Sequence, residues 1–222
     1  MLLGIGEILN LFSDNQTGLE DLPIQGGKLS VWREFLSLDE ASKLYSELSE
    51  YTTWEAREIV VWGKRVLQPR LIAWYGDEGA TYTYSGSKFE PLEWTNTLLS
   101  LKLKLQKTLN CEFNSCLLNF YRNGSDAMGW HSDDEPELGL FPKIASLSLG
   151  AKRDLMFRSK KNAPQLTPFR IELRDGDLLV MDGALQTNWD HSIPRSTRVI
   201  DPRINLTFRK IESFNKQELF NQ

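Results

Sequence analysis

The chain has 222 residues, of which 41% are apolar, and its formal net charge is −4. Because a chain of this length can bury most of its apolar surface in one core, we expect a single domain over residues 1–222. No apolar run reaches about 18 residues and no basic leader precedes the apolar stretch near the N-terminus, which argues against membrane-spanning and secreted classes. We therefore expect a protein of the cytoplasm in a bacterium, or of the nucleus in a eukaryote.

Two amphipathic helices are predicted in the first half of the chain. Ser37 and Glu40 have the spacing of a capping box, and the helix that they open runs to about residue 50. A second helix over about 92–109 is indicated by a stripe of four leucines, Leu98, Leu101, Leu105 and Leu109. Each helix has one apolar face, so we expect both to pack against a sheet.

The other segments have the character of β-strands. Val60 and Val61 before Gly63 predict a hairpin with Trp62 near its tip. From about residue 112 to Arg209, short strands alternate with turns, which is typical of a double-sheet jelly roll. The expected fold class is therefore α+β, mostly β, with a jelly-roll (double-stranded β-helix) core. The tail after residue 210 is expected to be peripheral and partly mobile.

The cysteines predict neither a disulfide framework nor a zinc site. Cys111 and Cys116 are the only two in the sequence, and their spacing matches no common zinc signature. A reducing compartment is therefore expected.

The two histidines, His131 and His191, are the residues from which a reaction class can be inferred. Asp133 lies two positions after His131, and on an extended segment residues at this spacing project to the same side. Two imidazoles and one carboxylate form the ligand set of a non-haem Fe(II) centre with open coordination positions. The triplet alone is a weak signal, because a histidine near an aspartate is more often an ordinary hydrogen-bonded pair.

Alternation along residues 202–209 predicts a strand with one polar and one apolar face. The polar face holds Arg203, Asn205, Thr207 and Arg209. Two buried guanidiniums would lose solvation unless an anion paired with them, and the planar fork of arginine suits a dicarboxylate. Asn119 and Tyr121 share a face in the same way and offer an amide and a phenol to that ligand. Without the histidines, an exposed edge strand with solvated arginines is the commoner meaning of this pattern.

In order and spacing, these motifs resemble the AlkB family of Fe(II)/2-oxoglutarate-dependent dioxygenases, which repair alkylated nucleic acid. The likeness covers roughly residues 55–210, with motifs at 69–70, 74–77, 82–86, 119–135, 146–150, 190–194 and 202–209. It is closest to the branch that acts on duplex DNA. The resemblance implies an N-terminal helical extension over 1–55, a substrate-recognition region over 56–90 and a jelly-roll core over 112–210.

The resemblance also implies roles for individual residues. Those that match the catalytic iron ligands are His131, Asp133 and His191. Those that match the partners of 2-oxoglutarate are Arg203 at the distal carboxylate, Arg209 near the metal-bound end, and Asn119, Tyr121 and Asn205. In the family's reaction, Fe(II), 2-oxoglutarate and O2 oxidise an N-methyl group, which leaves as formaldehyde while 2-oxoglutarate becomes succinate.

An alkylated base inside a duplex must be flipped out before it can reach a buried iron. The residues expected to bind substrate are Trp62, Arg70, Tyr82, Tyr84, Asp134 and Glu135. The resemblance implies that Tyr84 stacks on the base, that Tyr82 and Glu135 read its edge, and that Trp62 enters the base stack. Other members carry aspartate in place of Glu135, so the base preference stays open. For Trp62, packing on the sheet is an equally good interpretation.

Charge is segregated along the sequence. Residues 1–56 carry ten acidic and three basic side chains, a net of −7, whereas residues 152–210 carry twelve basic and seven acidic, a net of +5. The basic residues predicted to form a phosphate-facing rim are Arg57, Lys64, Arg65, Arg70, Arg158, Lys160, Lys161, Arg195 and Arg198. For any single member, solvated surface is the simpler interpretation.

We therefore expect a monomeric DNA repair dioxygenase that acts on alkylated DNA, duplex included, with bases of the 1-methyladenine and 3-methylcytosine type. Whether RNA is also a partner stays open, and no membrane partner is expected. Two alternatives stay open at this point. One is a related oxygenase that acts on RNA or protein, and the other is a jelly-roll binding module without catalysis. Succinate production from 2-oxoglutarate separates the binding module from the enzymes.

Overall fold

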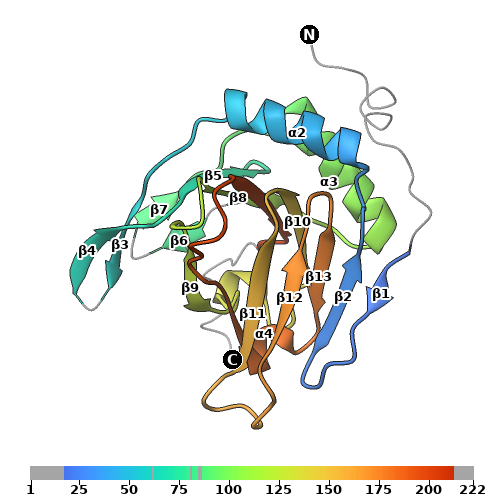
Figure 1. Cartoon of the computed structure of the whole chain (residues 1–222), viewed down its shortest axis with the longest axis vertical. Helices are drawn as coiled ribbons and strands as arrows, with labels where there is room; N and C mark the ends of the chain where they lie inside the picture. The colour runs from blue at the N-terminus through green and yellow to red at the C-terminus, as the bar shows by residue number, and fades with distance from the viewer. Residues whose placement is uncertain (1–17, 62, 81, 85–86, 213–222) are drawn as a thin grey trace, which may run out of the picture.

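Two antiparallel sheets make up most of the protein (Figure 1). The computed structural model describes residues 18–61, 63–80, 82–84 and 87–212. The larger sheet has the strand order β1 (Glu20–Asp21), β2 (Lys28–Trp32), β13 (Leu178–Asp182), β10 (Ile144–Gly150), β15 (Arg203–Arg209), β8 (Ser115–Tyr121) and β5 (Leu71–Gly76). The smaller sheet has the order β12 (Phe169–Leu173), β11 (Arg153–Ser159), β14 (Trp189–Ile193) and β9 (Met128–His131). The arrangement confirms the expected mostly-β jelly roll.

Two hairpins lie outside these sheets. They are β3 (Glu58–Val61) with β4 (Lys64–Leu67), and β6 (Tyr82–Tyr84) with β7 (Ser87–Phe89). The β3–β4 hairpin projects away from the sheets, as Figure 1 shows. The pairing of β3 with β4 confirms the predicted hairpin, whereas Trp62 lies outside the described residues.

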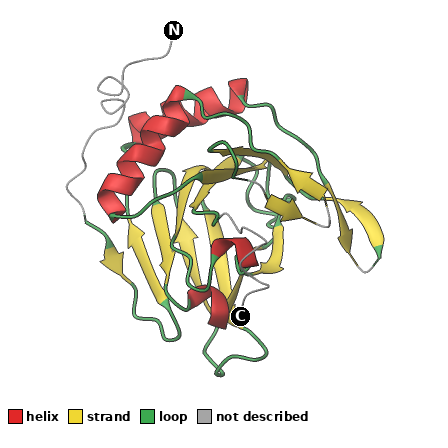
Figure 2. Ribbon diagram, turned by 180° about the vertical axis from the view of Figure 1, so that it is seen from behind, coloured by secondary structure: helices red, strands yellow, loops and turns green. Residues whose placement is uncertain are grey.

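Two helices cover the outer face of the larger sheet, as seen from behind in Figure 2. Helix α2 (Leu38–Tyr51) begins with the predicted capping box between Ser37 and Glu40. Helix α3 (Asn96–Leu109) begins four residues later than expected, because Thr95 caps it and the backbone N–H of Leu92 donates instead to Trp74. Among the helices of the described residues, none has the length and apolar character needed to span a membrane.

Strand β15 has the two faces that its alternation predicts. Ile204, Leu206 and Phe208 are fully buried against the helices. Arg203 and Asn205 are also buried, but they point into a cavity between the two sheets. One apolar cluster therefore fills the space between the helices and the larger sheet, and a second lies between the two sheets, beside the polar residues of β15 that build a site.

Two of the boundary expectations were wrong in part. The segment 1–55 is not wholly helical, because β1 and β2 join the larger sheet, where β2 pairs with β13. Leu29 and Val31 of β2 are buried. Two alternate apolar residues in a strand of five are too few to predict that strand from the sequence. The beginning of the tail is not peripheral either. Ile211 is buried and hydrogen-bonded to Asn114, whereas residues 213–222 lie outside the described part.

Candidate active site

Strand pairing explains how two histidines sixty positions apart meet. In the smaller sheet, His131 on β9 and His191 on β14 are direct antiparallel partners, and their ring centres are 4.2 Å apart. Asp133 follows two residues after His131, just beyond the end of β9. One ligand atom from each of the three residues lies within 4.8 Å of the other two. The sequence pattern therefore corresponds to a compact triad.

Each residue of the triad keeps one atom available to a metal ion. His131 Nδ1 lies 2.9 Å from the carbonyl oxygen of Gly129 and can only donate there, which leaves Nε2 as the free acceptor. Asp133 Oδ1 accepts from Arg209 Nη2 at 2.7 Å. Asp133 Oδ2 has no hydrogen-bond partner among the described residues and lies 3.9 Å from His191 Nε2. Two imidazole nitrogens and one carboxylate oxygen in this arrangement fit a divalent iron ion.

The protonation states of His191 and Asp133 also suit the binding of a metal cation. Burial, followed by the charge of His131, lowers the pKa of His191 to about 3. The imidazole is therefore neutral at physiological pH, which is the form that binds metals. Burial raises the pKa of Asp133, but Arg209 and then the two histidines outweigh it and the net shift is downward. An ionised and buried carboxylate with one unpaired oxygen is costly unless a cation binds it.

The cavity beside the triad holds a buried cation that lacks a full set of partners. Arg203 is only 2% exposed, and its Nη2 donates to Ser148 Oγ at 2.9 Å. Its guanidinium carbon lies 5.4 Å from the centre of the Tyr121 ring. Nε and Nη1 have no hydrogen-bond partner within the described part of the chain. Burial lowers the pKa of Arg203 to about 10, so the guanidinium stays charged and favours an anion.

Two amides on neighbouring strands complete the polar wall of this cavity. Asn205 Nδ2 donates to Ser146 Oγ at 2.8 Å and to the Leu147 carbonyl at 2.9 Å. Asn119 Oδ1 accepts from Arg70 Nε at 2.7 Å. Asn119 and Asn205 are direct partners in the β8–β15 register, which is why both amides face the same cavity.

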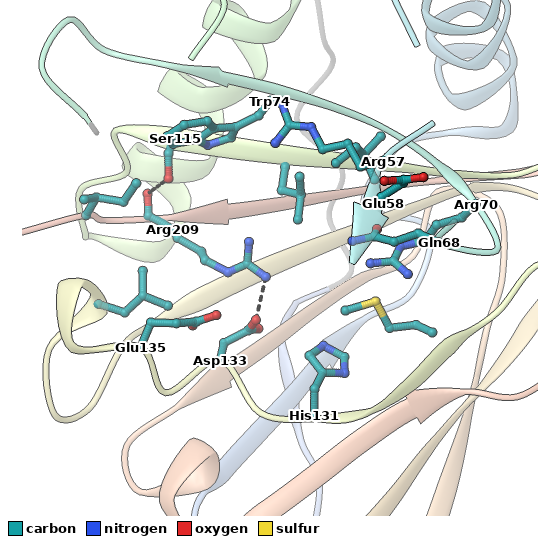
Figure 3. A pocket seen from close by; sticks show the side chains of 15 residues that line it. Arg57, Glu58, Gln68, Arg70, Trp74, Ser115, His131, Asp133, Glu135 and Arg209 are labelled. Carbon is teal, nitrogen blue, oxygen red and sulfur yellow. Dashed lines mark hydrogen bonds and ion pairs between the residues drawn. The ribbon is translucent and has the colours of Figure 1, made fainter. Parts of the chain in front are cut away.

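A second cavity, drawn in Figure 3, shares Leu117, Met128, His131, Asp133 and Arg209 with the first. Figure 3 places Glu135 on one side of this cavity and Glu58 and Gln68 on the opposite side. Its remaining lining residues are Arg57, Arg70, Ile72, Trp74, Ser115, Leu138 and Ile211. The triad therefore borders two cavities, which allows one ligand on each to meet at a shared metal ion.

Comparison with known proteins identifies the family. The family model of the 2OG-Fe(II) oxygenase superfamily matches residues 28–209. Alpha-ketoglutarate-dependent dioxygenase alkB homolog 3 of Homo sapiens is 38% identical over 85% of this chain and 68% of its own length. DNA oxidative demethylase ALKBH2 of Mus musculus is 42% identical over 78% of this chain and 75% of its own length. The chain belongs to the AlkB family.

Other relatives of this AlkB-family chain agree. The alkB homolog 3 of Bos taurus is 41% identical over 80% of this chain and 64% of its own length. The chain therefore spans about two thirds of the length of the curated homolog 3 relatives that it matches. A solved structure of OsALKBH1 has a TM-score of 0.58 at 17% identity, covers 86% of this chain and 99% of its own, and supports the fold alone.

Membership in the AlkB family confirms the expected enzyme class and cofactors. This is a family of dioxygenases that use Fe(II) as metal and 2-oxoglutarate as co-substrate together with O2. The triad fits the iron, and the partly unpaired Arg203 fits a carboxylate of 2-oxoglutarate. The alternative of a binding module without catalysis is therefore set aside.

Of the residues expected to bind substrate, Asp134 lies outside both cavities, whereas Arg70 lines the second cavity and not the predicted basic rim. Asp134 does not line the second cavity but forms an ion pair with Lys160 at 2.6 Å, facing a separate outer groove. The alternation that turns Asp133 inward turns its neighbour outward. Arg70 is only 7% exposed and therefore does not belong to a solvent-facing rim. It lines the second cavity and bonds Asn119, because it leads directly into the buried strand β5.

The aromatic residues expected to hold the base cannot be placed in the same detail. The backbone of Tyr82 and Tyr84 forms β6, but their side chains lie outside the described part of the structure, as does the whole of Trp62. Glu135 does line the second cavity. Their roles as substrate contacts stay predictions.

The predicted basic rim consists of two kinds of residue. One kind already has a carboxylate partner. Arg158 pairs with Asp190 at 3.1 Å and its guanidinium lies over the ring of Trp130. Arg57 forms an ion pair with Glu55, and Arg65 forms one with Glu58. Four members are exposed and have no ion pair with a carboxylate of the described residues, namely Lys64, Lys161, Arg195 and Arg198. These four are the residues best placed to meet an external anion.

Several residues of the site escaped the sequence interpretation. Gln68 lines the second cavity with a buried Oε1 that has no hydrogen-bond partner among the described residues. Trp74 and Ile211 form part of its wall. Gln186 bonds the backbone of Asp133. Gln68 directly precedes the motif at 69–70, which was a usable signal, whereas nothing in the sequence marked Gln186.

Proposed function

We propose that the protein is a DNA repair dioxygenase that oxidatively demethylates N-alkylated bases of the 1-methyladenine and 3-methylcytosine type. The observation that carries this proposal is a triad that borders two cavities, one with a buried guanidinium and one with carboxylates and an aromatic wall. Similarity to proteins named DNA oxidative demethylase supports DNA as the substrate.

The metal site in this proposal is formed by three atoms. His131 Nε2, Asp133 Oδ2 and His191 Nε2 would hold the iron, while Gly129 and Arg209 hold the other polar atoms of His131 and Asp133. When bound, Fe(II) with 2-oxoglutarate and O2 supplies the oxidising power that converts the N-methyl group to a hydroxymethyl group. The protein itself supplies position and exclusion of water.

The co-substrate site is assigned to the first cavity. Arg203 would pair with the distal carboxylate of 2-oxoglutarate through its two unpartnered nitrogens, which suit a planar anion. Tyr121 and Asn119 line the same cavity and would offer a phenol O–H and an amide N–H to the ligand, whereas the Nδ2 of Asn205 already donates to Ser146 and Leu147. Arg209 borders both cavities and would neutralise charge near the metal-bound end.

The flipped base is assigned to the second cavity. An N-methylated adenine or cytosine carries positive charge, which favours the carboxylates of Glu58 and Glu135 that line the cavity. The unpaired Oε1 of Gln68 offers an acceptor to an exocyclic amine of the base. We assign base stacking to Tyr84 and edge reading to Tyr82 on the resemblance alone. The hydroxymethyl product breaks its C–N bond to release formaldehyde and the restored base.

The decisive experiment is mass spectrometry of short oligonucleotides. Strands that carry 1-methyladenine or 3-methylcytosine, single or in duplex, are incubated with the protein, Fe(II), 2-oxoglutarate and O2. We expect loss of the methyl group from DNA with matched succinate, and no loss with His131→Ala, which removes a metal ligand. If succinate forms but only methylated RNA or peptide is consumed, DNA is the wrong substrate. If neither forms, the proposed activity is wrong altogether.

Action on duplex DNA is a finer proposal that rests on the hairpin around Trp62. A flat ring that enters the base stack offsets part of the cost of unstacking, which is a few kcal/mol. Trp62→Ala is therefore expected to reduce demethylation of duplex at least about tenfold and to change that of single strands little. The measurement is kcat/KM on both forms of one methylated oligonucleotide. Equal loss on both forms would mean that Trp62 packs on the protein instead.

We further propose that one domain and one chain are sufficient for this activity. The three residues of the triad and both arginines of the co-substrate site come from a single chain. No second chain is needed to complete either cavity as described, and this supports a monomer. The single domain in this proposal is the one expected over residues 1–222.

A further inference from the structure

Gln186 is a buried amide that connects a short helix to the metal site. It lies on α4 (Leu185–Asn188), is 1% exposed, and its Oε1 accepts a hydrogen bond from the backbone N–H of Asp133 at 3.0 Å. Within the described part of the chain its Nε2 hydrogen-bonds to the sulfur of Met181 alone, at 3.5 Å, and a thioether sulfur is a weak acceptor. The strong hydrogen bond of this side chain therefore ends on the main chain of a triad residue.

The main chain of Asp133 needs such a partner. Strand β9 ends at His131, so the ladder of the smaller sheet does not reach Asp133. No backbone carbonyl in the described residues accepts its N–H, and the Gln186 side chain takes that place. A buried N–H without a partner is costly, so this bond resists rotation of the main chain away from α4.

Two contacts together determine which oxygen Asp133 presents. Gln186 holds its backbone and Arg209 Nη2 holds Oδ1 at 2.7 Å. Oδ2 is the atom that remains, and it faces His191 Nε2 at 3.9 Å. His191 lies on β14, which follows α4 directly along the chain. The segment 185–193 thus carries His191 of the triad and also the Gln186 side chain that holds Asp133 in place.

We propose that Gln186 is a positioning residue of the metal centre, which holds the main chain of Asp133 so that Oδ2 stays directed between the two imidazoles. Partners behind metal ligands typically contribute 10- to 100-fold to metal affinity. The inference rests on the metal site of the proposed function and is independent of the substrate. Gln186 lines neither cavity of the active site but borders the outer groove with Asp134, so it reaches the metal site through Asp133.

The test measures metal affinity without turnover. Gln186→Met has an unbranched side chain of similar length but no oxygen acceptor, so it leaves the Asp133 N–H buried without a partner. Binding of Mn²⁺ alone to metal-free protein is followed by isothermal titration calorimetry. We expect the Kd for Mn²⁺ to rise about 10- to 100-fold in Gln186→Met relative to the wild type.

Two further variants separate positioning from general stability. Gln186→Glu keeps an oxygen acceptor in either protonation state and is expected to restore the Mn²⁺ affinity to within about tenfold of the wild type. Leu185→Val is the matched control, because Leu185 is the fully buried neighbour on the same helix and packs in the core. We expect this variant to lower Tm but to leave the Kd unchanged.

Three outcomes overturn the proposal. They are Mn²⁺ binding by Gln186→Met that equals the wild type, a Gln186→Glu variant that binds as weakly as Gln186→Met, and a Leu185→Val variant that weakens binding as much. A wild type that binds no Mn²⁺ would overturn the metal site as well. A wild type that binds Mn²⁺ but demethylates no DNA would leave the role of Gln186 standing and remove only the proposed substrate.

Discussion

Arg203→Met is expected to weaken 2-oxoglutarate binding on the order of 100- to 1,000-fold while raising the thermal stability of the ligand-free protein. Removing one partner of a buried, hydrogen-bonded charge pair typically costs about 2–5 kcal/mol of binding free energy, or about 30- to 5,000-fold in Kd, and the expected loss lies within that range. In the ligand-free protein the same guanidinium lowers the stability of the fold, because Nε and Nη1 are buried without hydrogen-bond partners among the described residues. Replacing a buried ion by an apolar side chain of similar size is often neutral or stabilising.

The measurements for this variant are the Kd of 2-oxoglutarate with Mn²⁺ in the metal site, and Tm without ligands. At this chain length each kcal/mol of stability changes Tm by about 2–4 °C. Arg203→Lys keeps the charge but loses the planar fork, so an intermediate Kd is expected. Arg170→Met removes an exposed arginine of β12 and is the matched control, with both values unchanged. Unaltered binding of 2-oxoglutarate in Arg203→Met would show that the carboxylate is held elsewhere.

The opposing effects on binding and stability have one physical cause. Ser148 and the ring of Tyr121 satisfy only part of the buried guanidinium, and burial has already lowered its pKa to about 10. A ligand carboxylate would supply the missing hydrogen bonds and the missing charge. A buried guanidinium that lacks hydrogen bonds in the ligand-free protein binds an anion well, because the anion supplies those hydrogen bonds.

The polar faces of β8 and β15 could be predicted from the sequence because side-chain direction in a strand repeats every two residues. The rule placed Arg203 and Asn205 on one side and Leu206 on the other without any knowledge of the sheets. The meeting of His131 with His191 was predicted from metal-ligand chemistry and from the family resemblance, and not from any local pattern. Their pairing depends on the register of β9 with β14, which no local pattern expresses.

The two misplaced residues have different causes. Asp134 was expected to bind substrate with Glu135, although period two turns Asp134 to the outside when Asp133 is inside. Arg70 was assigned to a surface rim by its charge, yet its guanidinium is satisfied in the interior by Asn119. A charged side chain can be buried wherever tertiary structure supplies a partner, and the sequence does not show that partner.

The places of Gln186 and Ile211 at the site could not be predicted from the sequence. Neither residue belongs to a recognisable motif, and both reach the site through contacts between distant segments. Gln186 lies 53 positions from the backbone N–H that it binds, and Ile211 lies 97 positions from Asn114. Such contacts depend on the complete fold, so only the structure could reveal them.

Asp133→Ala is expected to abolish both turnover and the stabilisation that a metal ion gives. In the wild type, Mn²⁺ at about 100 times its Kd should stabilise the folded state by roughly 2.7 kcal/mol, or about 5–10 °C in Tm at this chain length. The variant lacks Oδ2, the unpaired atom that faces His191, so we expect no shift in Tm on adding Mn²⁺. The loss of turnover should exceed the roughly 100-fold effect of disturbing a partner behind a ligand.

The metal-induced change in Tm isolates the ligand role of Asp133 from its structural role. Asp133→Ala also breaks the ion pair with Arg209, and the metal-free variant should therefore melt below the wild type. That loss is present with and without Mn²⁺ and cancels when the two Tm values of one protein are compared. Asp154→Ala is the matched control, because Asp154 lies on the smaller sheet and pairs only with the exposed Arg170 among the described residues. A full Mn²⁺ shift in Asp133→Ala would mean that the two histidines bind the ion without this carboxylate.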